Sequence, residues 1–201
     1  PNKEIVNYFF YKNARSVFCQ STFHKNIAFK NLKLKNIYNV SGNLWSLDTL
    51  EVIRVLAKNK KTKLCSIMNS GIEHKNTRGA IRYASENNIK YVLIQSQSYH
   101  EFLSKLSKND TFLFLPKTPE TLSRVLVEAR MLGCKVLTNN LVGASIEPWF
   151  EKKDEELIEY MISKRDEIYF KIKELSEVRR SSKKKPLVSI ITTFHKGEKF
   201  L

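Results

Sequence analysis

The chain has 201 residues, of which 42% are hydrophobic and 11% aromatic, and its formal net charge at pH 7 is +15. This length and composition allow a sizeable buried core, which excludes a disordered tail. The charge favours an anionic partner: a nucleic acid, an anionic membrane or an anionic ligand. The lysines are dispersed along the chain, and no zinc-finger spacing, aromatic RNA-binding motif or arginine-rich arm is present, so nucleic acid is not the expected partner.

Cysteine and histidine usage points away from metal sites. Cys19, Cys65 and Cys134 lie far apart, each in or beside an apolar run, which favours buried free thiols in a reducing compartment. The four histidines show no metal-ligand spacing, so neither a metal nor a cofactor is expected. No apolar run approaches the roughly 18 residues of a membrane span. The expected location is therefore cytoplasmic.

Short apolar runs alternate with amphipathic segments from about residue 14 to residue 150. Strands are expected at 14–20, 36–40, 63–68, 91–95, 111–115 and 135–138, and helices at 22–31, 47–58, 75–87, 99–106 and 122–132. This alternation indicates right-handed βαβ crossovers, so the predicted fold class is α/β, with a Rossmann-like parallel sheet flanked by helices. Ligands of such sheets lie at the carboxyl ends of the strands, here the turns after Met68, Gln95 and Leu115.

The C-terminal part begins with a long charged helix, expected over residues 154–178. Its apolar stripe consists of Ile158, Met161, Ile162, Ile168, Ile172 and Leu175. Residues 179–186 are rich in lysine and arginine and are expected to form a basic, solvated linker. A second apolar strand is expected over 187–193.

The segment from Phe114 to Ala144 carries the clearest functional pattern: strand, turn, helix and second strand. Glu120 and Glu128 are eight residues apart, a little over two helical turns, so both are expected to reach one side of a ligand along the helix start. A helix start of this kind attracts phosphate, and carboxylates can hold sugar hydroxyls. The pattern therefore suits a nucleoside diphosphate ligand.

The turn before this helix is expected to bind the phosphates. The backbone N–H groups of Thr121, Leu122 and Ser123 stand where a helix leaves its donors unpaired, and the Ser123 hydroxyl can add another donor. Thr121 equally fits the structural role of N-cap residue.

The same residues resemble those of a known enzyme family. Glu120, seven residues and Glu128, with Pro116 before and Gly133 after them, are similar to the donor-binding half of retaining GT-B glycosyltransferases of group one, also called family four. This family includes capsule and lipopolysaccharide sugar transferases and usually has Gly-Phe-Pro where this chain has residues 121–123. The resemblance implies the C-terminal half of a GT-B fold. It also implies sugar transfer from a UDP- or GDP-sugar donor to a carbohydrate or lipid-linked hydroxyl acceptor in bacterial surface polysaccharide or glycan synthesis.

The resemblance also implies roles for individual residues. Glu120 would approach the hydroxyls of the donor sugar, and Glu128 would accept both ribose hydroxyls of the nucleotide. The structural alternatives are a helix-start carboxylate for Glu120 and a surface salt bridge for Glu128. The family implies no metal, and it implies loose peripheral association with the anionic inner face of the cytoplasmic membrane, where lipid-linked acceptors reside.

A basic residue completes the expected site. By resemblance, Lys75 would act with Glu120 in catalysis by stabilising the departing phosphate. The family has an arginine at the end of the preceding strand, where this chain has Asn69 and Ser70, and these two residues would then face the donor. Arg78 either replaces that arginine or is a solvated charge.

Four regions are expected along the chain. Residues 1–40 would end an acceptor-side domain and include the interdomain linker, and 41–178 would form the nucleotide-sugar-binding domain. Residues 179–186 would be the linker, and 187–201 resemble the first strand and turn of a GT-A family-two glycosyltransferase, with His195 where that family usually has Asn. The chain would then be a piece of a tandem enzyme that binds donor weakly and transfers sugar slowly or not at all alone.

Two rival functions remain open. A non-catalytic nucleotide-sugar-binding module fits the missing arginine, and turnover would separate it from an enzyme. A nucleic-acid-binding protein would show steep salt dependence of its affinity. A nucleotide-sugar epimerase or dehydrogenase would carry a Gly-x-Gly-x-x-Gly turn after its first strand, which this sequence lacks.

Overall fold

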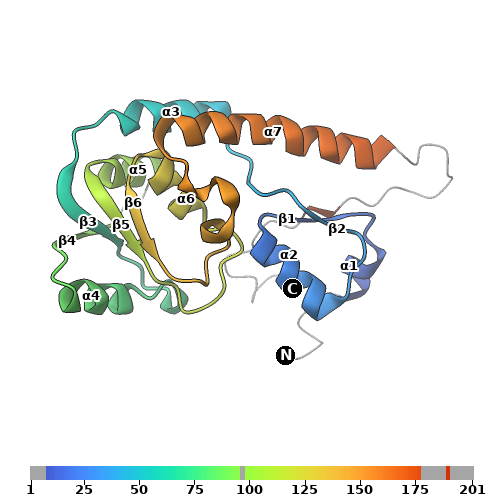
Figure 1. Cartoon of the computed structure of the whole chain (residues 1–201), viewed down its shortest axis with the longest axis horizontal. Coiled ribbons are helices and arrows are strands. Elements are labelled where there is room, and N and C mark those ends of the chain that lie inside the picture. Colours follow the sequence, from blue (N-terminus) through green and yellow to red (C-terminus); the bar gives the residue numbers. More distant parts are fainter. Residues whose placement is uncertain (1–7, 96–97, 178–188, 191–201) are drawn as a thin grey trace.

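The computed structural model describes residues 8–95, 98–177 and 189–190 (Figure 1). They form two parallel sheets, one of four strands and one of three, joined by packed helices. The predicted α/β class with a Rossmann-like parallel sheet is confirmed. The expected linker at 179–186 and most of the second domain expected at 187–201 lie outside the described residues.

The four-stranded sheet has the order β4-β3-β5-β6, from Tyr91–Ile94, Thr62–Met68, Asn109–Phe114 and Lys135–Thr138. All neighbouring pairs are parallel; Phe112, for example, lies opposite Ser66 on one side and Val136 on the other. Helices cover both faces of this sheet, which explains why its strands read as nearly continuous apolar runs.

Two cores lie on the two faces of the sheet. Phe112 and Phe114 point into the larger core, which is covered by α3 (Leu47–Ala57), α5 (Tyr99–Ser107), α6 (Arg124–Met131) and the first half of α7. Leu113, between them, points to the opposite face and packs under α4 (Thr77–Glu86). Figure 1 shows α4 on one side of the sheet and the other helices across from it. The alternation follows from the two-residue period of a strand.

The smaller unit contains β1 (Val17–Cys19), β2 (Ile37–Asn39), α1 (Tyr8–Asn13) and α2 (Thr22–Leu32). Its sheet has the order β2-β1-β7, where β7 is Ser189–Ile190 and pairs parallel to β1. The first two strands and both helices fall within the residues expected to end an acceptor-side domain, a domain assignment that stays a prediction.

Helix α7 (Asp154–Glu177) joins the two units. Leu157, Ile158 and Met161 are buried in the larger core, and Ile168, further along, is buried near the smaller sheet. Figure 1 shows the helix running from beside α3 to a position over β1 and β2. Two aromatic residues near its C-terminal end, Tyr169 and Phe170, remain exposed.

Three expectations concern properties that the described residues can address. Cys19, Cys65 and Cys134 are free and buried, and burial raises the pKa of each thiol, to about 12 for Cys19 and about 11 for the other two. None of the described helices is both long and apolar enough to cross a membrane. The described side chains contain no group of three or more potential metal ligands.

Candidate functional site

Several of the residues that the sequence singles out follow the carboxyl ends of β3 and β5 along the chain. Asn69 follows β3, Gln95 follows β4, and the turn of residues 115–123 follows β5. Asn69 donates a side-chain hydrogen bond to the Gln95 side chain at 2.8 Å, which ties the first two turns together. Because these strands are parallel neighbours, their ends meet at one edge of the sheet, the position where ligands of open α/β sheets bind.

Glu128 is a buried carboxylate in the second turn of α6, only 3% exposed. Its Oε1 atom accepts hydrogen bonds from the Trp45 indole N–H at 2.9 Å and the Tyr99 hydroxyl at 2.7 Å. The Arg124 Nε atom, one helical turn earlier, lies 3.5 Å from the same oxygen and its guanidinium lies over the Trp45 ring. The salt bridge considered as the structural alternative for Glu128 is thus present, with Arg124, but the carboxylate is buried and not on the surface. A carboxylate this deeply buried needs several donors.

The donors of Glu128 all reach one oxygen. Among the described residues no hydrogen bond reaches Oε2, which therefore keeps its acceptor capacity. The hydrogen bond to Glu128 also affects Tyr99. Partial burial of the Tyr99 hydroxyl, and then the charge of Glu128 and the hydrogen bond to it, raise the pKa of this hydroxyl well above its usual range. The tyrosine is thus held in its protonated, donating form.

Lys75 and Glu120 form an ion pair across two turns. The Lys75 ammonium lies 2.8 Å from Glu120 Oε1, and both side chains are largely buried, at 14% and 17% exposure. The ammonium also lies 5.4 Å from the centre of the Phe114 ring. Lys75 does not open a helix as expected: it ends a short 3₁₀ helix, η1 (Glu73–Lys75), and α4 begins at Thr77.

The turn between Glu120 and α6 differs from its predicted form. The helix begins at Arg124 and not at Leu122, because Ser123 adopts a left-handed backbone with φ of 68°. Thr121 is not the N-cap residue: its hydroxyl donates to the Gln20 side chain at 2.9 Å instead. Leu122 buries its side chain in the larger core, so only its backbone can face a ligand.

Ser123 contributes an unusual hydroxyl to this turn. Its side chain makes no capping hydrogen bond, and its Oγ atom is buried without a hydrogen-bond partner among the described residues. Buried hydroxyls are nearly always satisfied in native structures, so an orphaned one requires an explanation. The first N–H groups of α6 begin at the next residue, as a helix start requires.

Ser70 and Arg78, two of the remaining predicted residues, differ in their surroundings. The Ser70 hydroxyl accepts the Ile72 N–H at 3.2 Å, and the Ser70 N–H donates to the Thr77 hydroxyl at 3.1 Å. Arg78 lies exposed in the first turn of α4 and makes no hydrogen bond or ion pair with the described site residues. The structure thus brings together Lys75 with Glu120, but it does not bring Arg78 to them.

Sequence reasoning missed Trp45, Tyr99 and Arg124. Arg124 carried a local signal, because it precedes Glu128 by four residues and such pairs face each other on a helix. Tyr99 is the first residue of α5, directly after the turn that follows β4, which also placed it near the predicted ligand edge. Trp45 lies 83 residues before Glu128, and nothing local in the sequence indicates their contact.

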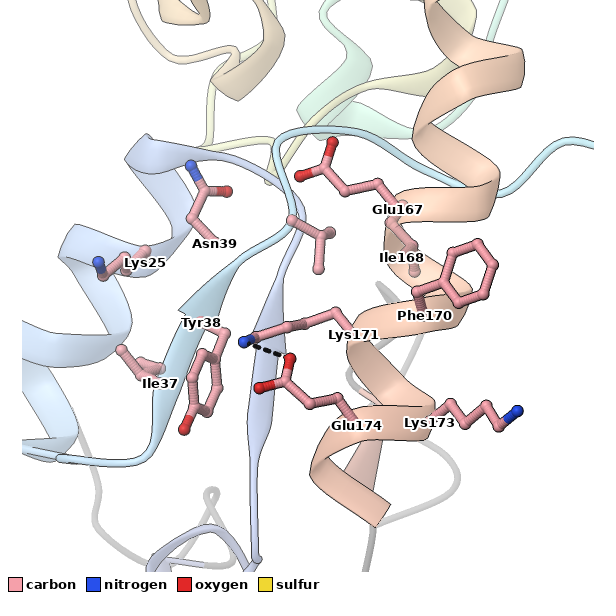
Figure 2. Close-up of a pocket in the computed structure, with 11 residues that line it drawn as sticks. Lys25, Ile37, Tyr38, Asn39, Glu167, Ile168, Phe170, Lys171, Lys173 and Glu174 are labelled. Atoms are coloured by element: carbon pink, nitrogen blue, oxygen red, sulfur yellow. Dashed lines mark hydrogen bonds and ion pairs between the residues drawn. The ribbon is translucent and has the colours of Figure 1, made fainter. Parts of the chain in front are cut away.

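A separate groove lies away from these residues, between β2 and the second half of α7 (Figure 2). Its volume is about 980 Å³, and Tyr38, Asn39, Phe170 and Lys171 are among the residues that line it. Lys171 is paired with Glu174 at 2.8 Å and lies over the Tyr38 ring, so the charge of this lysine is neutralised within the groove.

Comparisons with known proteins leave the family undetermined. No protein-family model matches the chain, and no curated protein matches it either. The function must therefore be argued from the site.

Proposed function

We propose that this chain is the nucleotide-sugar-binding part of a glycosyltransferase, with the ligand at the carboxyl ends of β3, β4 and β5. The donor would be a UDP- or GDP-sugar and the acceptor a carbohydrate or lipid-linked hydroxyl in surface polysaccharide or glycan synthesis. The proposal includes a cytoplasmic location with peripheral association at an anionic membrane, and it includes no metal or cofactor.

The observation that carries the proposal is the one-sided hydrogen bonding of Glu128. Two hydrogen bonds and the ion pair with Arg124 hold Oε1, and among the described residues no hydrogen bond reaches Oε2. A buried carboxylate with one fixed oxygen and one free oxygen is oriented in advance to accept hydroxyl donors from a ligand. A ribose presents two neighbouring hydroxyls, which matches this acceptor.

The phosphates are assigned to the turn before α6. The helix start supplies unpaired N–H groups, and the buried Ser123 hydroxyl has no other described partner. Arg124, the first residue of the helix, adds a positive charge at this end of the site. Lys75 adds a second, although it is shared with Glu120. We assign the role expected of Arg78 to Arg124, because Arg78 lies apart from the site.

The chemistry of transfer follows from these positions. The bond between the anomeric carbon and the phosphate oxygen breaks, and its electron pair leaves with the nucleoside diphosphate. The acceptor oxygen bonds to the anomeric carbon and its proton is released. Lys75 and the start of α6 stabilise the negative charge that develops on the leaving group. Glu120, held by Lys75, accepts hydroxyls of the donor sugar.

A non-catalytic nucleotide-sugar-binding module is the second candidate function. Two observations favour it: Asn69 and Ser70 stand where the resembled family has arginine, and the Lys75 charge is already neutralised by Glu120. Release of free sugar or transfer to an added acceptor, measured with each donor over hours, separates an enzyme from such a module.

Calorimetric titration with UDP, GDP and ADP tests the proposal. We expect one of them to bind with micromolar to millimolar affinity, and Glu128→Ala and Lys75→Ala to weaken that binding. Glu86→Ala and Lys90→Ala are matched controls, because both residues are exposed and lie outside the site. Equal binding by all four variants would contradict the proposed site, and so would binding of no nucleotide.

A further inference from the structure

Residues of the smaller unit form hydrogen bonds to the turn that is proposed to bind phosphate. The Ser21 hydroxyl donates to the Thr121 carbonyl oxygen, 100 residues away in sequence, and the Thr121 hydroxyl donates to Gln20 Oε1 at 2.9 Å. The carbonyl oxygen and the hydroxyl of Thr121 are therefore held by two consecutive residues, the Gln20–Ser21 pair. Gln20 is 8% exposed and Ser21 fully buried, so water cannot readily replace either contact.

The Gln20–Ser21 pair is itself fixed at the start of α2. Ser21 is the N-cap residue of α2, and its Oγ accepts the His24 N–H at 3.1 Å. The buried Glu147 carboxylate, from the larger unit, accepts the Thr22 N–H and the Ser41 hydroxyl. The start of α2 is thus joined to the larger unit by one charge-assisted hydrogen bond, from Thr22, and the segment after β2 by another, from Ser41.

Steric packing closes the remaining side of the turn. Gly143 donates its N–H to the Glu120 carbonyl oxygen at 2.9 Å. A Cβ atom at position 143 would overlap the Thr121 carbonyl oxygen and the Ser21 hydroxyl, so only glycine fits there. Neither the Gln20–Ser21 pair nor the Gly143 loop can move without displacing Thr121.

Ser123, two residues after Thr121, shows why these contacts with Thr121 matter. Ser123 holds a left-handed backbone, which non-glycine residues adopt only where the surrounding structure enforces it. The same residue carries the buried hydroxyl without a described partner and precedes the free N–H groups of α6. Release of Thr121 would let this strained turn relax and would move its donors.

We propose that Ser21 and Gln20 are positioning residues that hold the Glu120–Ser123 turn in its phosphate-binding form. This inference rests on the proposed function, because it assigns the phosphates to that turn. It predicts that loss of the pair weakens binding of the phosphate portion of a nucleotide and leaves binding of the nucleoside portion, which we assign to Glu128, unchanged.

The test compares nucleoside diphosphates with nucleosides. Affinities of UDP, GDP and ADP, and of uridine, guanosine and adenosine, are measured for the unsubstituted chain, Ser21→Ala, Gln20→Met and the rescue variant Ser21→Thr. For the base that binds best, Ser21→Ala should lower the diphosphate affinity by about three- to tenfold, the loss of one hydrogen bond. Gln20→Met should do the same, nucleoside affinity should not change, and Ser21→Thr should restore the diphosphate affinity. Equal losses for diphosphate and nucleoside, or no loss, would overturn the inference.

Loss of a helix cap needs its own control. Ser46→Ala removes the N-cap of α3, where Ser46 accepts the Thr49 N–H at 3.1 Å, as Ser21 does at α2. Amide hydrogen exchange of residues 122–125 without nucleotide should accelerate in Ser21→Ala and not in Ser46→Ala, and unchanged exchange in both would overturn the inference. Failure of the unsubstituted chain to bind any nucleotide would instead overturn the proposed function, and with it the phosphate role of the pair. The exchange result would still show whether the pair holds the turn.

Discussion

The hydrogen bond between Tyr99 and Glu128 allows a quantitative test with a single-atom change. Tyr99→Phe removes the hydroxyl that donates to Glu128 Oε1 at 2.7 Å and keeps the ring. Among the described residues, the buried carboxylate would then retain Trp45 and Arg124 as partners. A hydrogen bond to a charged group contributes about 1.5–3 kcal/mol, and leaving a buried charge under-satisfied adds to the loss.

The expected loss lies at the lower end of that range. Tyr99 is 47% exposed, so water can partly replace its hydroxyl. We expect the free energy of unfolding in urea to fall by about 1.5 kcal/mol, and the thermal midpoint to fall by about 3–6 °C for a chain of this size. Tyr83→Phe is the matched control, because Tyr83 is similarly exposed, at 39%, and its hydroxyl makes no hydrogen bond with the described residues. A Tyr99→Phe effect no larger than that of Tyr83→Phe would refute this account of how Glu128 is held.

The pH dependence gives a second measure of the same contact. Because the folded state raises the pKa of Tyr99 above its ordinary value of 10, the folded chain keeps the hydroxyl proton where the unfolded chain loses it. Its contribution to stability is therefore complete below pH 10 and falls as the pH rises further. The stability difference between the unsubstituted chain and Tyr99→Phe should shrink above pH 10; a difference that grows there would contradict the assignment.

Two further predictions concern the start of α2 and the glycine beside it. Burial lowers the pKa of His24 from 6.5 to about 4, so the stability due to neutral His24 is complete above pH 6.5 and is lost as the pH falls towards 4. Between pH 7 and pH 4 the free energy of unfolding, measured by thermal unfolding, should therefore fall less for His24→Asn than for the unsubstituted chain. The two falls should differ by at most about 3 kcal/mol, and equal falls would contradict this burial. Gly143→Ala should lower the free energy of unfolding by about 1–3 kcal/mol, because its Cβ overlaps Thr121. Gly71→Ala, with open space around it, should leave stability nearly unchanged, and equal effects of the two substitutions would count against the close packing.

The strands of the fold could be predicted because their signal is local. The apolar run at 135–138 coincides with β6 (Lys135–Thr138), and the run at 91–95 with β4 (Tyr91–Ile94) within one residue. Parallel strands covered on both faces need apolar side chains at nearly every position, which makes such runs easy to recognise. The long charged helix expected at 154–178 agrees with α7 (Asp154–Glu177) within one residue. Its signal is also local, because apolar residues recur at helical spacing along its length.

The turn before α6 could not be predicted in detail. Thr121 has the side chain of a good N-cap residue, but Gln20 and Ser21, about 100 residues earlier, take its polar groups instead. These hydrogen bonds depend on the tertiary structure, so no local sequence pattern predicts that they replace the N-cap role of Thr121. The left-handed backbone of Ser123 then delays the helix until Arg124.

The assignment of acidic and basic residues to a donor site stays a prediction, but the contacts among these residues can be compared with the sequence. Glu120 and Lys75 were assigned to one site, and the structure pairs them at 2.8 Å. Glu128 was also assigned to it, although its burial and its contacts with Trp45 and Tyr99 were not foreseen. These contacts join residues from α5, α6 and the segment before α3, and their convergence depends on packing of the whole core.

A ligand comparison tests the central claim, ribose recognition by Glu128, most directly. The measurement is the affinity of the best-bound nucleoside diphosphate and of its 2′,3′-dideoxy analogue for the unsubstituted chain and for Glu128→Gln. If Glu128 accepts the ribose hydroxyls, removing them should weaken binding to the unsubstituted chain by about ten- to a hundredfold, and should cost Glu128→Gln far less. An equal loss in both proteins, or no loss in the unsubstituted chain, would contradict the account.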